Sequence, residues 1–385
     1  MYLTHLSLQN FRNFAELELD FGKGVTVLFG GNAAGKTNLL EAVYMLATAK
    51  SLRAGSEREL ISWASEEQDE IPYARVRGVV QREAGPVQLE VVVQLARTPT
   101  DDGLQLQKRG RVNGVPKRAS DLVGQANAVL FAPQDIELVH GPPSIRRRYL
   151  NIMLSQADNS LLRELQRFNR VLAHRNSLLK AIRERRSSTQ ELPFWDSELI
   201  DSGATITGQR TVAMASLRAL ARDIHGELTG SEEELDIEYS PSVRAEGEGD
   251  LKAAFAVALD AAREKEMLQG MSLIGPHRDD FTFSANGRDM AVYASRGQQR
   301  TAALALKLAE ARFLGERAGD PPLLLLDDVF SELDGRRRSY LLAWIASWEQ
   351  ALLTTAEPER IDPAVLAEAR MLEVRAGQVG PPDET

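Results

Sequence analysis

Apolar and polar residues alternate along the first part of the chain, as β-strands with one buried face require. The alternation covers most of residues 2–21 and returns at 73–81 and 87–95, which predicts several strands of a partly exposed sheet. The run Ala128–Phe131 is apolar throughout and predicts a short buried strand. The N-terminal third of the chain is therefore expected to be rich in β-structure.

A helical pattern replaces this alternation in the middle of the chain. Apolar residues recur there in two series, first Leu161, Leu165, Phe168, Leu172, Leu179 and Ile182, and then Leu199, Ile206, Ala213, Leu217, Leu220 and Ile224. Arg175 interrupts a core position of the first series, and a polar break at 187–193 separates the two. The pattern predicts an antiparallel pair of helices of about 26 residues each, hence roughly 40 Å long. The acidic stretch 231–249 is expected to be a loop before another helix at 250–267.

A glycine-rich loop lies between a strand pattern at 25–29 and a helical pattern at 38–46. Its spacing, Gly30 and then Gly35-Lys36-Thr37, is that of a phosphate-binding loop. In such a loop backbone N–H groups surround a triphosphate, the lysine reaches the β- and γ-phosphates, and the hydroxyl binds Mg²⁺. An ordinary glycine-rich turn is the alternative, and it does not require a strand before it and a helix after it. The expected nucleotide-binding residues, which we call the P-loop, are Gly30, Gly31, Asn32, Ala33, Ala34, Gly35, Lys36, Thr37 and Asn38.

Two further stretches carry chemistry that suits the other half of such a site. Four leucines run into Asp327 and Asp328, and in P-loop ATPases an apolar strand that ends in Asp holds Mg²⁺. Asp328 stands where a second acid can activate water. A buried strand followed by a solvated turn is the alternative, which the P-loop upstream makes the weaker one. Residues 295–299, which we call the signature turn, precede a helical pattern at 301–314, and a small-residue turn at a helix N-terminus binds anions.

Composition and charge narrow the class of protein. The chain of 385 residues is long enough for about two domains. It has no cysteine, which excludes disulfides and thiolate metal sites. It shows neither a membrane-spanning apolar run nor a signal-peptide pattern, so a cytoplasmic protein without a membrane segment is expected. The net charge is −9, but residues 144–186 carry eleven Lys/Arg against three Asp/Glu, and residues 187–250 carry four against fourteen.

Five stretches together resemble the RecF family of bacterial recombination mediators, relatives of the SMC and Rad50 heads. They are residues 10–13, 30–37, 275–280, 295–300 and 326–334. The resemblance covers nearly the whole chain and is least distinct at 187–260 and after 376. It implies an α/β fold: an ABC-type P-loop ATPase head with an inserted helical lobe that forms a short antiparallel arm. The head would comprise residues 1–133 and 271–385, and the lobe residues 134–270.

The resemblance also implies roles for residues of the head. Arg12 would approach the nucleotide, which would be ATP, and Gln134 would stand at the Q-loop beside it. The residues implied to bind Mg²⁺ are Thr37, Gln134 and Asp327, and those implied to serve catalysis are Lys36, Gln134 and Asp328. Many ABC ATPases place Glu at the position of Asp328, and transport-type members place a switch histidine where this chain has Thr354-Thr355. Both differences imply slow hydrolysis.

The signature turn implies a site shared between two subunits. Ser295, Gly297 and Gln298 of one subunit would close over the ATP held by the P-loop of the other. The protein would therefore form an ATP-dependent homodimer. His277, in the stretch 275–280, is expected to have a structural role.

The function implied by the resemblance is DNA replication and repair within the SOS response. The protein would be a weak, DNA-stimulated ATPase on double-stranded DNA, at gaps and single-strand/double-strand junctions. There it would work with RecR and RecO to load RecA. Arg146, Arg147 and Arg148 would contact phosphates, a solubilising helix face being the alternative. The alternative function is the ATPase subunit of a membrane transporter, which the helical insert, the missing switch histidine and the stretch 275–280 do not favour.

Overall fold

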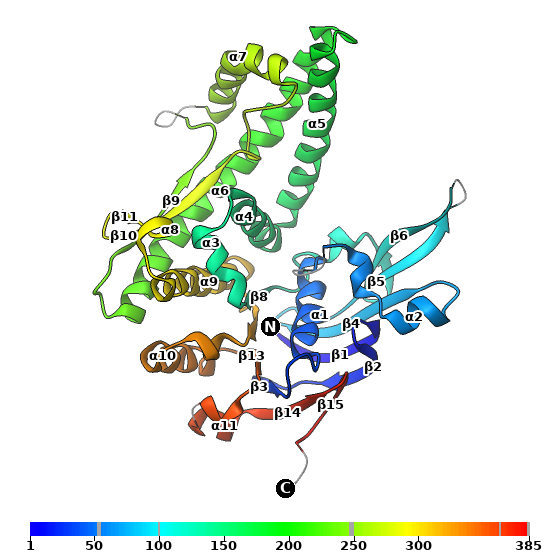
Figure 1. Cartoon of the computed structure of the whole chain (residues 1–385), viewed down its shortest axis with the longest axis vertical. Coiled ribbons are helices and arrows are strands. Elements are labelled where there is room, and N and C mark those ends of the chain that lie inside the picture. The colour runs from blue at the N-terminus through cyan, green and yellow to red at the C-terminus, as the bar shows by residue number, and fades with distance from the viewer. Residues whose placement is uncertain (52–54, 99–100, 246–249, 362, 383–385) are drawn as a thin grey trace. The chain divides into compact units, whose positions relative to one another are not determined.

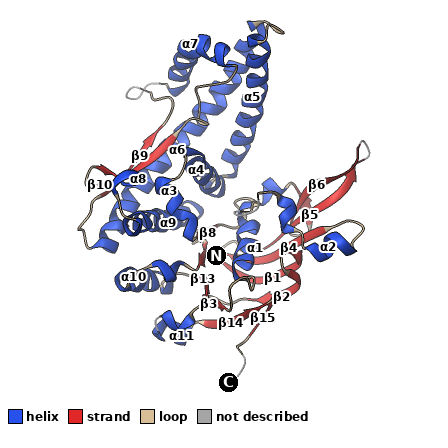
Figure 2. Ribbon diagram, viewed as in Figure 1, coloured by secondary structure: helices blue, strands red, loops and turns tan. Residues whose placement is uncertain are grey.

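The computed structural model of the protein describes residues 1–51, 55–98, 101–245, 250–361 and 363–382. Its contacts divide the chain into two compact units (Figure 1, Figure 2). Unit 1 comprises Met1–Asp135 and Lys307–Thr385, and unit 2 comprises Ile136–Leu306. Unit 1 is therefore built from both ends of the chain, and unit 2 is inserted between them in sequence.

The described residues of unit 1 form two six-stranded sheets. The first is antiparallel, in the order β2-β1-β4-β5-β6-β7. Its strands are β1 (Tyr2–Phe11), β2 (Phe14–Asp20), β4 (Tyr73–Arg82), β5 (Gly85–Thr98), β6 (Asp101–Val112) and β7 (Val115–Lys117). The second sheet has the order β15-β14-β3-β13-β12-β8 and is parallel except at β15. Its strands are β3 (Gly24–Phe29), β8 (Ala128–Phe131), β12 (Leu323–Asp327), β13 (Gln350–Thr355), β14 (Arg370–Arg375) and β15 (Gln378–Gly380).

The parallel sheet places the candidate site. Every residue of β12 and β13 is buried, as in parallel strands that are covered on both faces. In the register of the sheet, Thr354 pairs with Asp327 on one side, and Thr355 pairs with Phe29 on the other. Because the strands are parallel, their C-terminal ends meet at one edge, which is where ligands bind in open α/β sheets. The loops that carry the P-loop, Asp328 and Gln134 all leave the sheet at this edge.

Helices and short 3₁₀ turns complete unit 1. They are α1 (Lys36–Thr48), α2 (Trp63–Gln68), α10 (Gly335–Ala346) and α11 (Pro363–Glu368), with η1 (Glu57–Leu60), η2 (Ala119–Leu122), η3 (Pro133–Ile136), η5 (Val329–Glu332) and η6 (Pro358–Arg360). Helix α1 is buried at every residue from 39 to 48, which explains why its sequence there is apolar on all sides apart from Glu41 and Thr48. Helix α9 (Arg296–Ala318) begins in unit 2, and its residues from Lys307 onward belong to unit 1.

Unit 2 is mainly helical. Its elements are α3 (Glu137–His140), α4 (Pro143–Ala157), α5 (Asn159–Arg183), η4 (Thr189–Glu191), α6 (Leu192–Thr229), α7 (Leu251–Gln269) and α8 (Met290–Tyr293), with a sheet of β9 (Leu235–Ser240), β10 (Asp280–Ala285) and β11 (Arg288–Asp289) in the order β11-β10-β9. Helices α5 and α6 pack side by side (Figure 1), and their short connection makes them antiparallel. No helix in the described ranges is long and apolar enough to cross a membrane.

Three expectations from the sequence need comment. The two helices of the arm are not of similar length, because α5 has 25 residues and α6 has 38. Helix α6 continues through Gly203, Gly208 and Gly226 and ends only at Gly230, which has the left-handed conformation at φ +72°. The acidic stretch 231–249 is also not all loop, since β9 pairs with β10; its residues 246–249 lie outside the described part. Residues 271–306 group with unit 2, and the division into head and lobe stays a prediction.

Arg175 interrupts the apolar series of α5 because it is the centre of a buried ionic network. Its side chain is 1% exposed. The guanidinium donates hydrogen bonds to carboxylate oxygens of Asp196 at 2.8 Å and Glu266 at 2.7 Å, and to Ser272 Oγ at 2.7 Å. Asp196 belongs to α6 and Glu266 to α7. One side chain of α5 therefore connects three helices of unit 2.

Removing this guanidinium should destabilise unit 2 strongly. We expect Arg175→Ala to lower the free energy of unfolding by about 3–5 kcal/mol, because it leaves the buried Glu266 carboxylate without its counter-charge and removes one of the two arginines that pair with Asp196. Denaturant unfolding followed by circular dichroism measures the change. Arg170→Ala, at an exposed position of the same helix, is the matched control and should change stability by less than about 0.5 kcal/mol. Equal stability of the two variants would contradict the assigned role of Arg175.

Candidate nucleotide-binding site

The backbone of the P-loop has a conformation that its glycines make possible. Gly30 has φ +147° and Gly35 has φ +115°. A Cβ atom at Gly30 would lie 2.3 Å from the carbonyl oxygen of Val374, and one at Gly35 would lie 2.5 Å from Nδ2 of Asn13. Helix α1 begins directly after Gly35, so its first N–H groups face the loop with partial positive charge. The loop is therefore built to approach an anion with its backbone.

The Lys36 ammonium lies inside the curve of this loop. Its Nζ donates hydrogen bonds to the carbonyl oxygens of Gly30 at 2.7 Å and Gly31 at 2.8 Å. Loss of water lowers the pKa of Lys36, and the nearby Asp328 and Asp327 carboxylates act in the opposite direction. A partly desolvated cation held only by neutral carbonyls favours an incoming anionic group.

The strand-end carboxylate meets the P-loop hydroxyl directly. Thr37 Oγ1 donates to Asp327 Oδ1 at 2.7 Å, and Thr354 Oγ1 donates to the same oxygen at 2.9 Å. Thr37 and Asp327 are 290 positions apart in the sequence. Hydroxyl and carboxylate oxygens are hard ligands of the kind that Mg²⁺ takes together with phosphate oxygens. The donor set present therefore fits Mg²⁺.

Asp328 has an unusual backbone and an oriented side chain. Its φ is +50°, in the left-handed region that non-glycine residues seldom adopt. Its N–H donates to Thr354 Oγ1 at 3.0 Å. Ser331 Oγ lies 2.8 Å from the carbonyl oxygen of Asp328 and 3.2 Å from its Oδ2. These contacts hold the carboxylate where the strand leaves the sheet.

These groups line one pocket of about 290 Å³ in unit 1. The lining residues are Asn32, Ala33, Ala34, Gly35, Lys36, Thr37, Asn38, Pro133, Asp327, Asp328, Thr354 and Ala356. The structure thus brings most of the P-loop together with both predicted aspartates. Gln134 follows Pro133 and is exposed in η3, and its assignment to catalysis and Mg²⁺ stays a prediction.

Arg12 forms hydrogen bonds to α1 and η1, and Asn13 forms one to the P-loop itself. The Arg12 guanidinium donates to both carboxylate oxygens of Glu41 at 2.9 and 3.1 Å, and to the Glu59 carbonyl at 2.9 Å. Asn13 Nδ2 instead donates to the carbonyl of Ala34 at 2.9 Å. Asn38 Nδ2 in turn donates to Asn13 Oδ1 at 2.8 Å. Contact of Arg12 with the nucleotide stays a prediction.

The sequence reasoning therefore missed three residues of the site. Asn13 lies in the stretch 10–13 that resembles the family, but no role was predicted for it. Glu41 is a buried acid in an otherwise apolar helix and is 2% exposed, which was a readable signal of a partner. Thr354 stands where transport-type ATPases have a switch histidine, but its contact with Asp327 could not be predicted, because it depends on how β12 and β13 are paired.

A cluster of charged side chains lies beside Gln134, in which Asp135 is half-buried and Lys307 and Glu310 are buried. Asp135 Oδ2 accepts a hydrogen bond from the N–H of Ala132 at 2.8 Å. Burial raises the pKa of Asp135 to about 6, which the Lys307 ammonium counteracts and the Glu310 carboxylate reinforces. Lys307 and Glu310 form an ion pair on α9. The turn that carries Gln134 thus also carries a carboxyl group whose pKa is about 6.

The signature turn lies at the beginning of α9 in unit 2. Ser295 and Gly297 are exposed, and Gln298 is half-buried. His277, in the same unit, makes a hydrogen-bonding contact with the carbonyl of Ser272 at 3.1 Å. Burial lowers the pKa of His277, so its ring is neutral at pH 7.

The three arginines predicted to contact DNA differ in their exposure and in their hydrogen-bond partners. Arg146 is 7% exposed and makes a bidentate ion pair with Asp280, at 2.6 and 2.8 Å. Arg147 is half-buried and donates to the carbonyl of Asp279 at 3.1 Å. Arg148 is exposed. The expectation of phosphate contact by Arg146 is therefore corrected, because its charge is used within the fold.

Comparison with known proteins identifies the family. The sequence matches the model of the RecF/RecN/SMC N-terminal domain over residues 2–376. The DNA replication and repair protein RecF of Chloroflexus aurantiacus is 45% identical over 391 residues, covering 98% of this chain and 99% of that protein. This chain belongs to the RecF family. The RecF of Herpetosiphon aurantiacus is 42% identical over 389 residues, covering 99% of this chain and 100% of that protein.

Solved structures agree with the RecF assignment. A structure described as the recombination mediator protein RecF-ATP in the RecFOR pathway has a TM-score of 0.86 at 32% identity, covering 98% of this chain and 97% of that one. The Smc head domain of Pyrococcus furiosus has a TM-score of 0.53 at 16% identity, covering 98% and 95%, and shares the fold. The expected α/β fold, an ABC-type ATPase head, is confirmed.

The raised pKa of Asp135 predicts a specific pH dependence of stability. Its folded pKa of about 6 exceeds the usual 3.8, so the folded protein binds more protons between these values. The contribution of Asp135 therefore falls as pH rises from about 4 to 6. We expect Asp135→Asn to be more stable than the parent by about 1–3 kcal/mol above pH 7 and by progressively less below pH 6. A stability difference that is independent of pH between 4 and 8 would contradict the raised pKa.

Proposed function

We propose that this chain is an ATP-dependent dimer that binds DNA and acts in recombinational repair. ATP binding would close two subunits over two nucleotides, and slow hydrolysis would open them. One observation carries the proposal, which is the contact of Thr37 Oγ1 with Asp327 Oδ1 at 2.7 Å. It supports a phosphate and metal half-site formed within unit 1. The description of a RecF relative as RecF-ATP supports ATP as its ligand.

Each side chain of this half-site would have a distinct task. Lys36 would exchange the carbonyls of Gly30 and Gly31 for the β- and γ-phosphates, because a phosphate matches its charge. Held by Thr37 and Asp327 together with Gln134, Mg²⁺ would neutralise charge on the phosphate oxygens.

Hydrolysis would depend on Asp328. Its carboxylate, oriented by Ser331, would accept a proton from the attacking water. The side chain is one methylene shorter than the Glu of many ABC ATPases and reaches less far. We therefore propose that hydrolysis is slow and that ATP acts as a timer.

The signature turn would complete the site of the other subunit. Ser295 and Gly297 are exposed at the N-terminus of α9, a helix of 23 residues. Such a terminus presents N–H groups and partial positive charge. It would face the γ-phosphate of an ATP held by the P-loop of the partner subunit. Neither subunit alone would then have a complete site.

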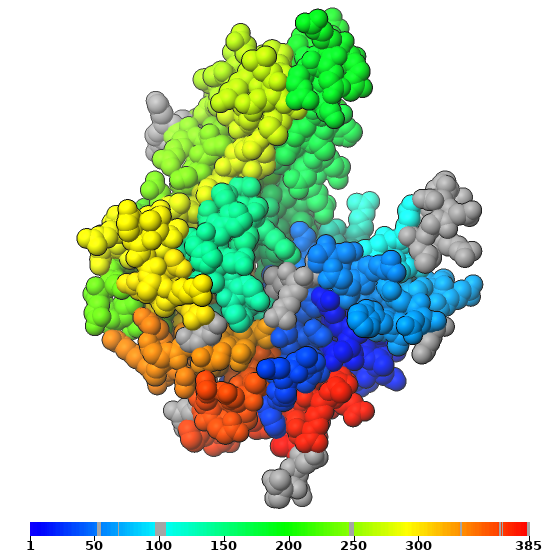
Figure 3. Space-filling view, in the orientation of Figure 1, coloured from blue at the N-terminus to red at the C-terminus, as the bar shows by residue number. Residues whose placement is uncertain are grey.

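DNA binding would use exposed arginines of α5. Arg163 and Arg170 are one heptad apart, so they share a face of the helix. In the described parts of the chain, neither has an ion-pair partner, whereas Arg167 between them pairs with Glu198 at 2.8 Å. Helix α5 lies open on the visible face of unit 2 (green in Figure 3). With the exposed Arg148, this face would contact phosphates without reading sequence.

The place in the pathway follows from the relatives. They are named as DNA replication and repair proteins, and one solved relative is described as a mediator in the RecFOR pathway. We propose that this chain acts at gaps and single-strand/double-strand junctions with RecR and RecO to promote RecA loading in the cytoplasm. The names of these relatives favour this function over that of a transporter ATPase subunit.

The split site predicts the behaviour of Ser295→Arg. This variant should bind ATP normally, because its P-loop is unchanged, but stay monomeric with ATP in sedimentation. ATP turnover should fall by about 100-fold or more, since a bulky side chain would fill the seam. Lys36→Met should not bind ATP. Wild-type turnover by monomeric Ser295→Arg would show that one chain contains the whole site.

Mixing the two variants provides an internal control. A mixed dimer has one composite site with both defects and one with neither, by the symmetry of a two-fold interface. The mixture should therefore regain at most about half of the normal activity, while each variant alone stays inactive. Failure to regain activity would contradict the composite site.

The face of α5 predicts a change in salt dependence. The double variant Arg163→Glu/Arg170→Glu should bind duplex DNA more weakly. The slope of log affinity against log salt should fall by about 1.8, because each phosphate contact contributes about 0.9. Lys265→Glu, at an exposed position of α7, reverses one positive charge elsewhere in unit 2 and is the control. A slope unchanged from the parent would mean that α5 does not contact DNA.

A further inference from the structure

The signature turn is closed by a reciprocal pair of hydrogen bonds. The N–H of Ser295 donates to Oε1 of Gln298 at 2.8 Å, and the N–H of Gln298 donates to Oγ of Ser295 at 3.3 Å. This is the capping box, in which the residue before the helix and the one three places later cap each other. The side-chain oxygen of Gln298 is therefore used within the turn.

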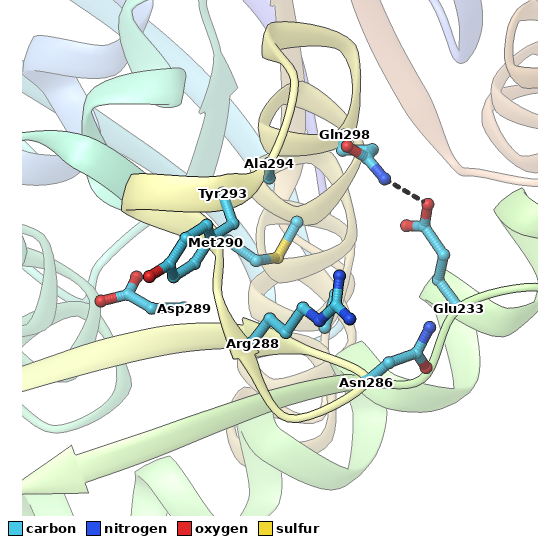
Figure 4. Close-up of a pocket in the computed structure, with 9 residues that line it drawn as sticks. Glu233, Asn286, Arg288, Asp289, Met290, Tyr293, Ala294 and Gln298 are labelled. Carbon is cyan, nitrogen blue, oxygen red and sulfur yellow. Dashed lines mark hydrogen bonds between the residues drawn. The ribbon is translucent and has the colours of Figure 1, made fainter.

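The side-chain nitrogen of Gln298 is also used. It donates to Oε1 of Glu233 at 2.6 Å, as the dashed line in Figure 4 marks. An ionised carboxylate can only accept hydrogen bonds, and a backbone N–H can only donate. Only one orientation of the amide satisfies both partners, with its nitrogen toward Glu233 and its oxygen toward Ser295. Glu233 thus fixes which end of Gln298 faces the turn.

Glu233 lies in the segment between α6 and β9, which approaches α6 and the turn between β10 and β11. Its side chain is 22% exposed, and Oε2 lies 3.9 Å from Nε2 of His225, a residue of α6 that is 0% exposed. The next residue, Glu234, donates its N–H to Oδ1 of Asn286 in the turn between β10 and β11 at 2.9 Å. The backbone of the segment between α6 and β9 is therefore anchored to the β10–β11 turn, and the Glu233 carboxylate faces a buried side chain of α6.

A pocket beside the capping box offers space for the Gln298 side chain if Glu233 is removed. It has a volume of about 400 Å³. Glu233 and Gln298 line it on one side, and Asp289 and Tyr293 lie on the other (Figure 4). Without the Glu233 carboxylate, the side-chain nitrogen of Gln298 would lose its acceptor, and the side chain would be able to rotate into the pocket. The N–H of Ser295 would then lose its acceptor, and the turn would loosen.

We propose that Glu233 is a positioning residue for the signature turn. It holds Gln298 so that the capping box is formed before ATP arrives, which leaves the O–H of Ser295 to donate elsewhere and the Gly297 N–H without an intrahelical acceptor. Gln298 accordingly acts through the cap and not as a direct contact of the nucleotide, the role that the family resemblance implied. The inference rests on the proposed function, in which this turn closes over the ATP of a partner subunit.

Exchanging the side chains of Glu233 and Gln298 tests the hydrogen bond between them. In Gln298→Glu the new carboxylate can still accept from the N–H of Ser295, but its other oxygen faces Glu233, and the two charges repel. Adding Glu233→Gln supplies an amide donor from the opposite side and restores the bond. We expect Gln298→Glu to reduce ATP-dependent dimerisation and turnover by about tenfold or more, as loss of a charge-assisted hydrogen bond does. The double variant should recover to within about threefold of the parent.

Hydrogen exchange provides a readout that needs neither dimer nor DNA. Without ATP, the backbone N–H groups of Ser295 and Gln298 should exchange faster in Gln298→Glu and in Glu233→Ala, and at the parent rate in the double variant. Glu232→Ala, at the exposed neighbouring position, should leave exchange and turnover unchanged. ATP binding by the monomer should be unaffected in all four.

Two results would overturn the inference. One is parental exchange and turnover in Gln298→Glu, and the other is a double variant no better than Gln298→Glu in exchange. Failure of the parent protein to dimerise with ATP would instead sink the proposed function. The exchange rates would still decide the role of Glu233.

Discussion

The contact between Thr37 and Asp327 depends on the register of the parallel sheet, and the rest of the candidate site depends on that contact. β13 lies between β3 and β12, and its pairing sets Thr354 beside Asp327. A slip of β12 by one residue would turn the Asp327 side chain to the opposite face, because side chains alternate along a strand. The carboxylate would then leave both hydroxyl donors. The complete burial of β12 and β13 makes such a slip costly.

The same sheet lets the two ends of the chain share one site. The N-terminal segment supplies the P-loop and its support from Asn13, and the C-terminal segment supplies Asp327, Asp328 and Thr354. The C-terminal segment also contacts the P-loop through its backbone, because Gly377 donates its N–H to the carbonyl of Ala34 at 3.2 Å. A Cβ atom at Gly377 would lie 2.3 Å from the carbonyl oxygen of Asn13. Close backbone approach from both ends therefore holds the loop in shape before any ligand binds.

Local patterns in the sequence predicted much of this arrangement. Strands β1 to β5, β8 and β12, the P-loop before α1, and Asp327 and Asp328 at the end of β12 follow from periodicity and spacing, which are local properties. The errors concern partners that are distant in sequence. Arg146 was read as a surface charge, but it pairs with Asp280, 134 positions away. The acidic composition of 231–249 predicted a loop, but part of this stretch forms β9, because it pairs with the distant β10. Glu233 could not be found either, because nothing near it indicates that it contacts Gln298.

The central claim is that the signature turn of one subunit meets the P-loop of another, and cross-linking tests it most directly. The chain has no cysteine, so Asn32→Cys in one preparation and Arg296→Cys in another provide single thiols at exposed positions. Mixed and treated with a short bis-maleimide, they should form a cross-linked dimer only when ATP is present. Each variant alone should give little product. Absence of the mixed product with ATP, or its equal formation without ATP, would contradict the account.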